Sequence, residues 1–381
     1  MKIVFVSGML PSGHYSQYIT NGLSKQKDVD LIVYTDKDPK NLTIKNCGST
    51  KLVWSKSPKY ILEIIKEIIK DQPDIIHLQQ ELNMYGGIFT ATLFPLLVLI
   101  LRLMRFTVVT TIHASVFKNQ IDDKFVEMFH KNSKVMKPEI LRWYFHFVFK
   151  SISVFSNKIL VHTNLAKKIL TEDYGLSDKK IVVVPIAIPQ KFVYQVEKEN
   201  YFFYFGYMVR RKGLGFALEG FRKYIENNPK SDFKFILAGG KIPGQEKAYD
   251  EIINIIKDNK LEDKVIVKGF IEEKEQDSLY QKAYAVVIPA ILSMGSSGPF
   301  FHANSYGKCT FASNIGHFKE DIDNNKTGVL TENDMWDKAF ELIAKDKKLV
   351  QEIESNVISK AKDRSPENTA KKYMNIYHEI V

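Results

Sequence analysis

The sequence has little cysteine: its 381 residues include only Cys47 and Cys309, which lie far apart in the chain. Neither has a Cys or His neighbour at metal-ligand spacing. This excludes a disulfide framework and a zinc site of the usual pattern, and it is typical of a reducing compartment. Glycine and proline number only 20 and 13, which excludes collagen-like repeats and long disorder. At about 150 residues per domain, the length predicts two globular domains.

Motifs of several enzyme classes are absent as well. The chain has no Walker A loop, no Gly-x-Ser-x-Gly turn and no His-Glu-x-x-His helix. These absences exclude P-loop nucleotide hydrolysis, α/β-hydrolase chemistry and a zinc-peptidase site. We expect no metal site and no bound cofactor. The opening run, Met1–Gly8, is short and turns polar too soon for a signal peptide, so we expect a cytoplasmic location.

Acidic residues are scarce in the first half of the chain. Residues 1–190 hold 25 Lys and Arg against 16 Asp and Glu, so nearly all of the net charge of +10 lies there. Residues 131–168 hold eight Lys and Arg and one acid, Glu139, interleaved with aromatic residues such as Trp143. This patch favours an anionic partner. No nucleic-acid-binding module is evident, so we expect a membrane surface and no nucleic acid; an ordinary amphipathic helix over 141–155 is the alternative.

One segment combines length with a complete lack of charge. Residues 82–101 contain no Asp, Glu, Lys or Arg, and twenty residues can span a bilayer as a helix. Gly86 and Gly87 interrupt the segment near its start, and it lies between two predicted strands. These features favour a helix buried in an α/β domain. A helix partly exposed at a membrane-facing surface is the alternative.

Short apolar segments alternate with amphipathic ones through both halves of the chain. The strands predicted in the first half are residues 2–7, 30–35, 74–78, 106–113, 158–162 and 181–185. Those predicted in the second half are residues 201–205, 233–238, 265–269, 285–289, 309–313 and 328–330. Helices are expected at 16–24 and 60–70, after Gly213, and from about Glu332. The alternation predicts an α/β fold of two doubly wound domains with parallel sheets, joined near Pro185 and Pro189.

The first candidate site follows the strand at 201–205. Parallel sheets of this kind bind ligands at the carboxyl ends of their strands. Here Gly206 opens a loop that carries three consecutive cations, Arg210, Arg211 and Lys212. Cations and free N–H groups before a helix suit a diphosphate. A solvated basic turn without a ligand is the alternative.

The second candidate site is a Gly/Ser-rich turn after the strand at 285–289. Ser296, Ser297 and Gly298 precede Pro299, which is a favourable first-turn residue of a helix. The hydroxyls and backbone N–H groups of such a turn suit an anion. A capped helix start without a ligand is the alternative.

Two histidines complete the candidates. His113 ends the strand at 106–113, and His14 lies in the loop after the first strand. Both positions are at the edge of the sheet where ligands bind. A purely structural role is the alternative for each.

Several segments, taken in order, resemble the retaining family-4 glycosyltransferases of GT-B fold over essentially the whole chain. They are Pro73-Asp-Ile-Ile-His77, Thr110-Thr-Ile-His113, Phe205-Gly206 with Lys212-Gly213, Leu237-Ala-Gly-Gly240, Lys268-Gly-Phe270, Tyr306-Gly-Lys308, Ala312-Ser-Asn-Ile-Gly316 and Asn325-Lys-Thr-Gly-Val-Leu330. The resemblance implies two Rossmann-like domains that face a central cleft. Residues 1–188 would bind the acceptor and 189–365 the nucleotide-sugar, with a C-terminal helix, 366–381, packing back on the first domain.

The resemblance also assigns roles to residues. Lys212 corresponds to the lysine that binds the diphosphate, and Tyr207 replaces the usual arginine, so Arg211 or Arg210 would substitute for it. His113 would face the transferred sugar. The remaining donor-site residues implied are Gly13, Gly206, Gly240, Phe270, Ile271, Ser296, Ser297, Gly298, Pro299 and His302, and the acceptor-site residues are His14 and Tyr15.

The sequence departs from the family in its Glu-x7-Glu motif. Counted back from Gly307, the two glutamates fall at Met294 and His302, so both carboxylates are replaced. In the family the first contacts the donor sugar and the second the ribose. His302 is expected to keep a hydrogen bond to a ribose hydroxyl, and Ser296 and Ser297 are expected to hold the diphosphate.

The resemblance implies a retaining hexosyltransferase that uses a nucleotide-sugar without a metal. The expected acceptor is a lipid-linked or cell-surface glycan, reached at the inner face of the cell membrane. A second interpretation, suggested by Met294 and His302, is a non-catalytic GT-B protein that binds a glycan or a partner. A third is another GT-B activity, such as a phosphorylase or an epimerase.

Overall fold

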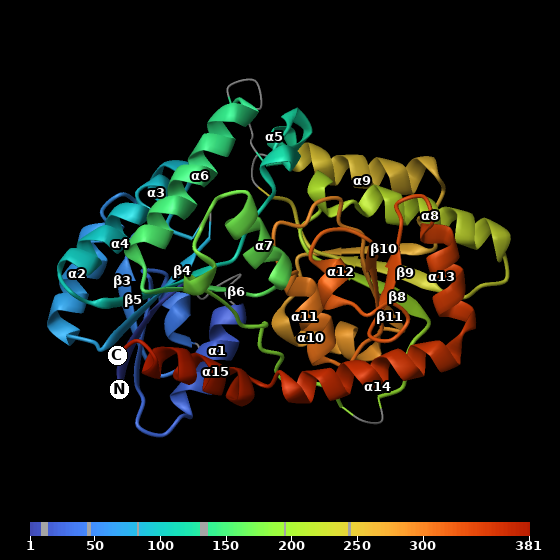
Figure 1. Ribbon diagram of the computed structural model, residues 1–381. Helices are drawn as coiled ribbons and strands as arrows, with labels where there is room; N and C mark the ends of the chain where they lie inside the picture. Colours follow the sequence, from blue (N-terminus) through green and yellow to red (C-terminus); the bar gives the residue numbers. More distant parts are fainter. Residues whose placement is uncertain (9–13, 44–46, 82–83, 130–135, 194–195, 243–244) are drawn as a thin grey trace.

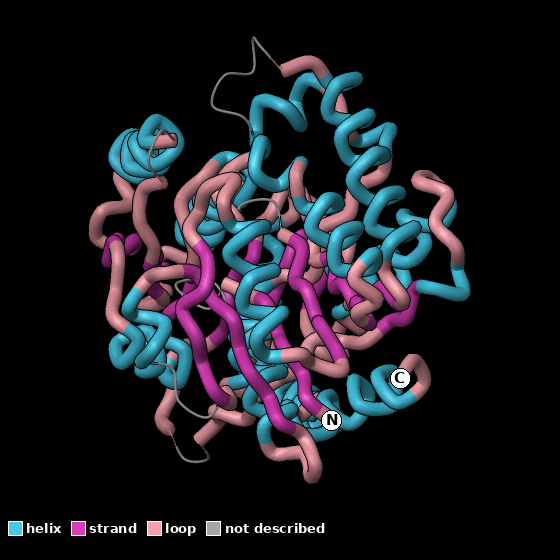
Figure 2. Tube along the Cα trace, turned by 90° about the vertical axis from the view of Figure 1, so that its left-hand side faces the viewer, coloured by secondary structure: helices cyan, strands magenta, loops and turns pink. Residues whose placement is uncertain are grey.

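The computed structural model describes residues 1–8, 14–43, 47–81, 84–129, 136–193, 196–242 and 245–381. It contains two parallel β-sheets, each with helices on both faces (Figures 1 and 2). The predicted α/β class, with two doubly wound Rossmann-like sheets, is confirmed. Every strand pair in both sheets is parallel, and α-helices lie in nearly all the connections within each sheet.

The first sheet has seven strands in the order β3-β2-β1-β4-β5-β6-β7. They are β1 (Lys2–Val6), β2 (Asp30–Asp36), β3 (Ser49–Trp54), β4 (Ile75–Gln80), β5 (Thr107–Ile112), β6 (Lys158–Val161) and β7 (Ile181–Val183). The side chains of β1 alternate between two cores: Val4 and Val6 lie in one, Ile3 and Phe5 in the other. Burial on both faces explains why this strand is a continuous apolar run.

Helices divide between the two faces of the first sheet. On the side of Val4 and Val6 lie α2 (Tyr60–Asp71), α3 (Ile88–Thr92), α4 (Phe94–Leu103), α5 (Asp123–Phe129), α6 (Pro138–Phe155) and α7 (Asn164–Glu172). On the side of Ile3 and Phe5 lie α1 (His14–Ser24) and α15 (Pro366–His378).

The second sheet has six strands in the order β10-β9-β8-β11-β12-β13. They are β8 (Tyr201–Phe205), β9 (Lys234–Ala238), β10 (Val265–Gly269), β11 (Ala285–Ile288), β12 (Thr310–Ser313) and β13 (Val329–Thr331). One face is covered by α8 (Leu214–Asn227), α9 (Glu246–Asp258), α13 (Trp336–Lys345) and α14 (Lys347–Asp363). The other is covered by α10 (Glu273–Lys282), α11 (Gly298–Ser305) and α12 (Phe318–Asp321).

The last helix returns to the first sheet. In Figure 1, α14 and α15 run from the second sheet to the first, and the two chain ends lie near each other. Ala370, Tyr373 and Tyr377 of α15 are fully buried with residues of α1 and β1. We therefore propose that residues 1–188 and 366–381 form one domain and residues 189–365 the other.

Three expectations need correction. The edge strand β3 was not among the predicted strands, because its first half, Ser49-Thr-Lys, is polar and either exposed or only partly buried. The uncharged segment 82–101 holds two helices, α3 and α4, separated at Leu93, with Pro95 in the first turn of α4. The C-terminal helical region begins at Trp336 and consists of three helices. None of the described helices is both long and apolar enough to cross a membrane.

Gly22 on α1 tests the docking of α15. A Cβ on Gly22 would lie 2.1 Å from the carbonyl oxygen of Pro366, which leaves no room for a methyl group. We expect Gly22→Ala to lower the free energy of unfolding by about 1–3 kcal/mol, as overpacked sites do. Urea unfolding followed by circular dichroism measures this. Gly87→Ala is the matched control, since a Cβ there meets nothing within 4 Å; equal losses in both variants would contradict the packing described.

Candidate functional site

The carboxyl ends of β8, β9 and β11 are joined through close backbone contacts at glycines. A Cβ on Gly239 would lie 1.8 Å from the carbonyl oxygen of Gly206, and one on Gly213 would lie 1.9 Å from that of Pro289. Gly213 also has a φ of 63°, the left-handed conformation that favours glycine. The Ile291 N–H donates to the Arg211 carbonyl at 3.0 Å. The first predicted anion-binding loop therefore packs against the start of the second, at Pro289 and Ile291.

Arg211 and Lys212 lie partly buried in the short 3₁₀ turn Arg210–Lys212 ahead of α8. Burial, and then the charge of Arg211, lowers the pKa of Lys212 to about 8. Burial likewise lowers the pKa of Arg211, while Tyr204 and Glu81 oppose that shift. Within the described chain, the Lys212 ammonium has no ion pair. Two neighbouring desolvated cations favour an anion beside them.

The Arg210 side chain is exposed, in contrast to those of Arg211 and Lys212. Its guanidinium forms a two-pronged ion pair with Glu251 of α9, and its side chain is 61% exposed. The ion pair raises the pKa of Arg210. In this arrangement Arg210 is held at the outer surface, so it is Arg211 that lies beside Lys212.

The loop after β11 presents unsatisfied hydroxyls. The Oγ atoms of Ser296 and Ser297 are buried and make no hydrogen bond of good geometry to any described residue, although Ser296 faces Asp321. Ser297 precedes α11, and Pro299 lies in its first turn, as predicted. A Cβ on Gly298 would meet open space. Buried polar atoms without partners are rare in folded proteins, so this turn is suited to a polar ligand.

The predicted donor-site residues near β9 and β10 differ in their exposure. Gly240 follows Gly239, and a Cβ on it would lie 4.0 Å from that of Phe270. The Phe270 ring is 80% exposed, whereas Ile271 is buried in the core under α10. An exposed ring next to the strand ends is available to stack on a base; Ile271 is available only through its backbone.

His113 lies at the end of β5 with both ring nitrogens hydrogen-bonded. Its Nδ1 is 3.3 Å from His162 Nε2, and its Nε2 is 2.7 Å from Gln79 Oε1. Burial lowers the pKa of His113 well below its ordinary value, so the ring is neutral. The residue lies at the predicted edge, but a sugar hydroxyl would have to displace Gln79 or His162 to reach a ring nitrogen.

The tautomers of these histidines follow from the acceptors around them. The Val184 carbonyl, 2.9 Å from His162 Nδ1, can only accept, so that nitrogen carries the proton and Nε2 accepts from His113. His113 Nε2 then needs a donor. With Oε1 directed at it, Gln79 provides none and its own Nε2 is buried without a partner among the described residues. Turning the Gln79 amide over supplies the donor and places Oε1 where the unpartnered Nε2 stood.

Of the predicted donor-site residue Gly13 and the predicted acceptor residues His14 and Tyr15, only Tyr15 has a described side chain. Gly13 lies outside the described residues, and His14 begins α1 without a described side chain. The hydroxyl of Tyr15 is hydrogen-bonded to that of Tyr373 on α15. Its ring packs against His113 at 5.0 Å between centroids. The Tyr15 ring therefore packs beside His113, and its hydroxyl is hydrogen-bonded within the protein.

The two positions that replace the glutamates serve contacts between the halves. Met294 packs against the core of the first sheet, and its carbonyl accepts a hydrogen bond from Ser115 N–H at 2.6 Å. His302 is buried, with Tyr18 at 3.1 Å from Nδ1 and Gln276 at 2.6 Å from Nε2. Both ring nitrogens thus have protein partners, so the expected ribose contact of His302 is not available in this arrangement.

Further contacts join the halves beside the site, and none was predicted. The Glu320 carboxylate accepts hydrogen bonds from the N–H groups of Asn164 and Leu165, at 2.7 and 2.8 Å, at the start of α7. A carboxylate there is favoured by the helix dipole. Thr163 is 2.7 Å from His317 Nδ1. These side chains and His162 were not among the predicted site residues. Of them, only His162 could have been found from the sequence, because it ends a predicted strand as His113 does.

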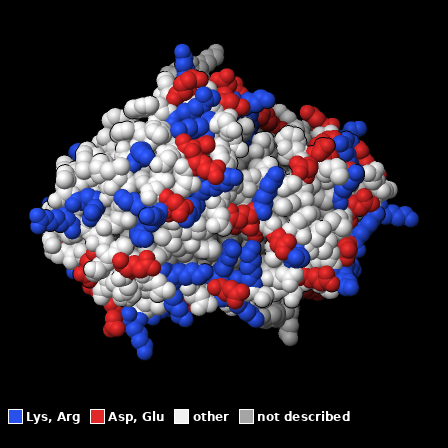
Figure 3. All heavy atoms as spheres, in the orientation of Figure 1, with Lys and Arg blue, Asp and Glu red and all other residues white. Residues whose placement is uncertain are grey.

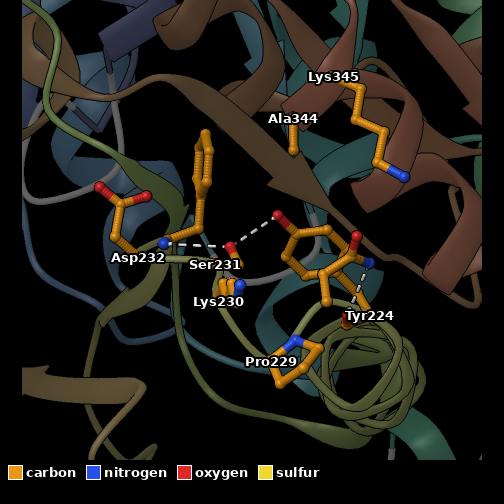
Figure 4. Close-up of a pocket in the computed structure, with 9 residues that line it drawn as sticks. Tyr224, Pro229, Lys230, Ser231, Asp232, Ala344 and Lys345 are labelled. Carbon is orange, nitrogen blue, oxygen red and sulfur yellow. Dashed lines mark hydrogen bonds between the residues drawn. The ribbon is translucent and has the colours of Figure 1, made fainter.

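A separate surface hollow of about 420 Å³ lies away from these strand ends. It is formed where α8 leads into β9, by residues that include Tyr224, Ser231 and Lys345 (Figure 4). The Tyr224 hydroxyl and Ser231 Oγ are 2.8 Å apart. The hollow contains none of the predicted site residues. Among the described residues, no group of three or more His, Cys, Asp or Glu is placed to hold a metal ion.

The buried histidines predict a pH-dependent stability. Burial lowers the pKa of His77 to about 3 and that of His162 to about 4, so the unfolded chain takes up these protons first as the pH falls. Stability is complete above about pH 6.5 and declines below it, by up to about 1.4 kcal/mol per pH unit for each such histidine. The pKa of Asp321, raised by burial to about 6, opposes this.

Urea unfolding at pH 7, 6 and 5 measures the slope. His77→Gln should make it shallower, whereas His378→Gln, at an exposed position on α15, should not. Identical slopes in His77→Gln and the unchanged protein would show that His77 is not folded in its neutral form.

Two family models match the chain. Residues 12–191 match the one described as Glycosyltransferase Family 4, and residues 189–364 match Glycosyl transferases group 1. No match is found among curated protein sequences.

Solved structures share the fold over nearly the whole chain. HepE from Anabaena, in complex with UDP-glucose, superposes with a TM-score of 0.76 at 14% identity and covers 100% of both chains. A glycosyltransferase from Rickettsia africae gives 0.72 at 19% identity, with 100% of this chain and 98% of that chain covered. Sucrose-phosphate synthase from Thermosynechococcus elongatus gives 0.73 at 14%, with the same coverage. These superpositions show that the fold is GT-B. Both family models match as well, so the chain belongs to glycosyltransferase family 4, a family of retaining glycosyltransferases.

Proposed function

We propose that the protein transfers a hexose from a nucleotide-diphosphate sugar to a hydroxyl of a lipid-linked or cell-surface glycan, with retention and without a metal. The observation that carries the proposal is the partly buried pair Arg211 and Lys212, on a turn that packs at Pro289 and Ile291 against the start of the loop holding the buried hydroxyls of Ser296 and Ser297. Together these groups would neutralise and hydrogen-bond a diphosphate.

A UDP-hexose is the donor we favour. HepE from Anabaena, which shares the fold, was solved with UDP and with UDP-glucose. In this chain the exposed ring of Phe270 would stack on the base, and Gly206 and Gly240 would let the backbone approach the nucleotide. The acceptor would enter from the first domain, near Tyr15 and His113, at the cytoplasmic face of a membrane.

Transfer would then rest on electrostatic stabilisation. The bond between the sugar C1 and the diphosphate oxygen breaks, and a bond from C1 to the acceptor oxygen forms on the same face. The acceptor proton passes to the departing diphosphate oxygen. Lys212, Arg211 and the amides at the start of α11 would stabilise the charge that develops on the diphosphate. His113 is neutral and would orient the sugar, in exchange for its contact with Gln79 or His162, rather than exchange a proton.

A non-catalytic binding protein is the second candidate, because Met294 and His302 are engaged inside the protein. Turnover separates the two. Release of UDP from UDP-hexose, with or without an acceptor, supports the transferase; nucleotide binding with no release under any condition supports the binding protein.

Lys212→Met tests the diphosphate contact. Loss of a charge-assisted hydrogen bond should weaken UDP binding by roughly 10- to 100-fold. Isothermal titration in EDTA measures the dissociation constant. Lys223→Met is the matched control, since Lys223 lies on α8 and faces Glu219. Unchanged UDP affinity in Lys212→Met would remove this residue from the donor site.

The pKa of Lys212 predicts how binding depends on pH. At a pKa of about 8, the ammonium is mostly protonated at pH 7 and mostly neutral at pH 9. UDP affinity should therefore fall by up to roughly tenfold over this interval, because the neutral amine no longer attracts the diphosphate. Titrations at pH 7, 8 and 9 check this, and the dependence should be absent in Lys212→Met. A flat profile in the unchanged protein would argue against the contact.

A further inference from the structure

Exposed apolar side chains gather on one layer of helices in the first half. Of the eighteen large hydrophobic side chains exposed among the described residues, ten lie on α2, α3, α4 and α6 or directly after α4. They are Leu62, Ile69, Phe89, Leu96, Leu103, Met104, Ile140, Trp143, Phe147 and Val154. Since α4 contacts α2, α3 and α6, these side chains occupy one outer face, which we call the α2–α6 face.

The pattern on α6 shows that this exposure is systematic. Ile140, Trp143, Phe147 and Val154 follow one another at spacings of three, four and seven, so they form a stripe along the solvent side of the helix. Trp143 is 65% exposed, and its ring stacks on that of Phe147 at 5.5 Å between centroids. The opposite side of α6 packs in the core. A helix that is apolar on both sides is typical of contact with a second apolar phase.

The charges on the α2–α6 face have one dominant sign. Residues 59–71, 88–105 and 137–155 hold eight Lys and Arg against four Asp and Glu. Three of the four acids form ion pairs with lysines. Among the described residues, no ion pair involves the exposed cations Lys59, Lys66, Arg105 and Lys137. Figure 3 shows the area over these helices as largely white, with Lys and Arg among the uncharged atoms.

We propose that the α2–α6 face is the surface on which the protein docks to a bilayer containing anionic lipids. Apolar side chains with a tryptophan, interspersed with cations, suit the boundary between acyl chains and headgroups. The spread of unpaired lysines over this face is unlike the centre of a protein–protein interface, where lysine is depleted. A cluster of exposed apolar side chains on one face marks an interaction site.

The face is continuous with the edge of the sheet that carries the site. α2, α4 and α6 each lead into the next parallel strand, so each begins at the carboxyl edge of the first sheet. His113 lies at that same edge. Docking would therefore bring the acceptor side of the site next to the membrane surface, which is the part of the inference that rests on the proposed lipid-linked acceptor.

Vesicle flotation of the full chain tests the docking surface. The vesicles contain phosphatidylcholine alone or with phosphatidylglycerol. We expect binding to the anionic vesicles, weakened by high salt, and a fall in the partition coefficient of at least about tenfold in the double variant Trp143→Ala/Phe147→Ala. Phe216→Ala/Leu342→Ala is the matched control, because these exposed residues lie on α8 and α13 of the second half, and it should bind as the unchanged protein does.

Three results would overturn the inference. They are no flotation with anionic vesicles, equal flotation of Trp143→Ala/Phe147→Ala, and a stable dimer in light scattering that this variant alone dissociates without any vesicle binding. The last would assign the face to a second copy of the chain. UDP titration of the same variants keeps the two proposals apart: intact nucleotide binding without flotation contradicts only the docking surface, and flotation without nucleotide binding contradicts only the proposed transferase.

Discussion

Desolvation of two adjacent cations is the constraint on which the site depends. Arg211 and Lys212 are partly withdrawn from water in a turn that Gly213 closes in a left-handed conformation, against the carbonyl of Pro289. The withdrawal lowers the pKa of both side chains, which means that the fold holds positive charge where it is disfavoured. An anion in the adjoining space would relieve this. We propose that the same ligand would satisfy the buried hydroxyls of Ser296 and Ser297, so that a single diphosphate would account for both features.

The contacts between the two halves involve the positions that differ from the family pattern. Met294 and His302 occupy the positions where the family resemblance places two glutamates. Met294 packs against the core of the first sheet, and His302 is hydrogen-bonded to Tyr18 of α1. Glu320 adds a carboxylate at the start of α7. These groups join the two halves beside the predicted anion-binding loops. Recognition of the sugar and ribose would thus fall to backbone groups and to side chains near His113, and the donor pocket would differ in its polar contacts from one lined by two glutamates.

Much of the fold could be predicted from local sequence, because buried parallel strands are short apolar runs that end at glycine or polar residues. The edge strand β3 could not be predicted in this way, since only its last residues are buried. The predicted loops do lie together at the carboxyl ends of the strands, but the sequence did not indicate in which direction each side chain points. Three consecutive cations look alike in the sequence, namely Arg210, Arg211 and Lys212. Only the geometry of the turn and the ion pair with Glu251 show that the Arg210 side chain lies at the surface. His302 could not be interpreted, because its partner Tyr18 lies 284 positions away in the chain.

The central claim is that this site recognises a diphosphate through buried cations. The most direct test compares the dissociation constants of uridine, UMP and UDP for the unchanged protein, in EDTA. The account predicts that each phosphate increases affinity and that the second contributes at least about tenfold, because it meets the charges of Arg211 and Lys212. Equal affinities for UMP and UDP would contradict it.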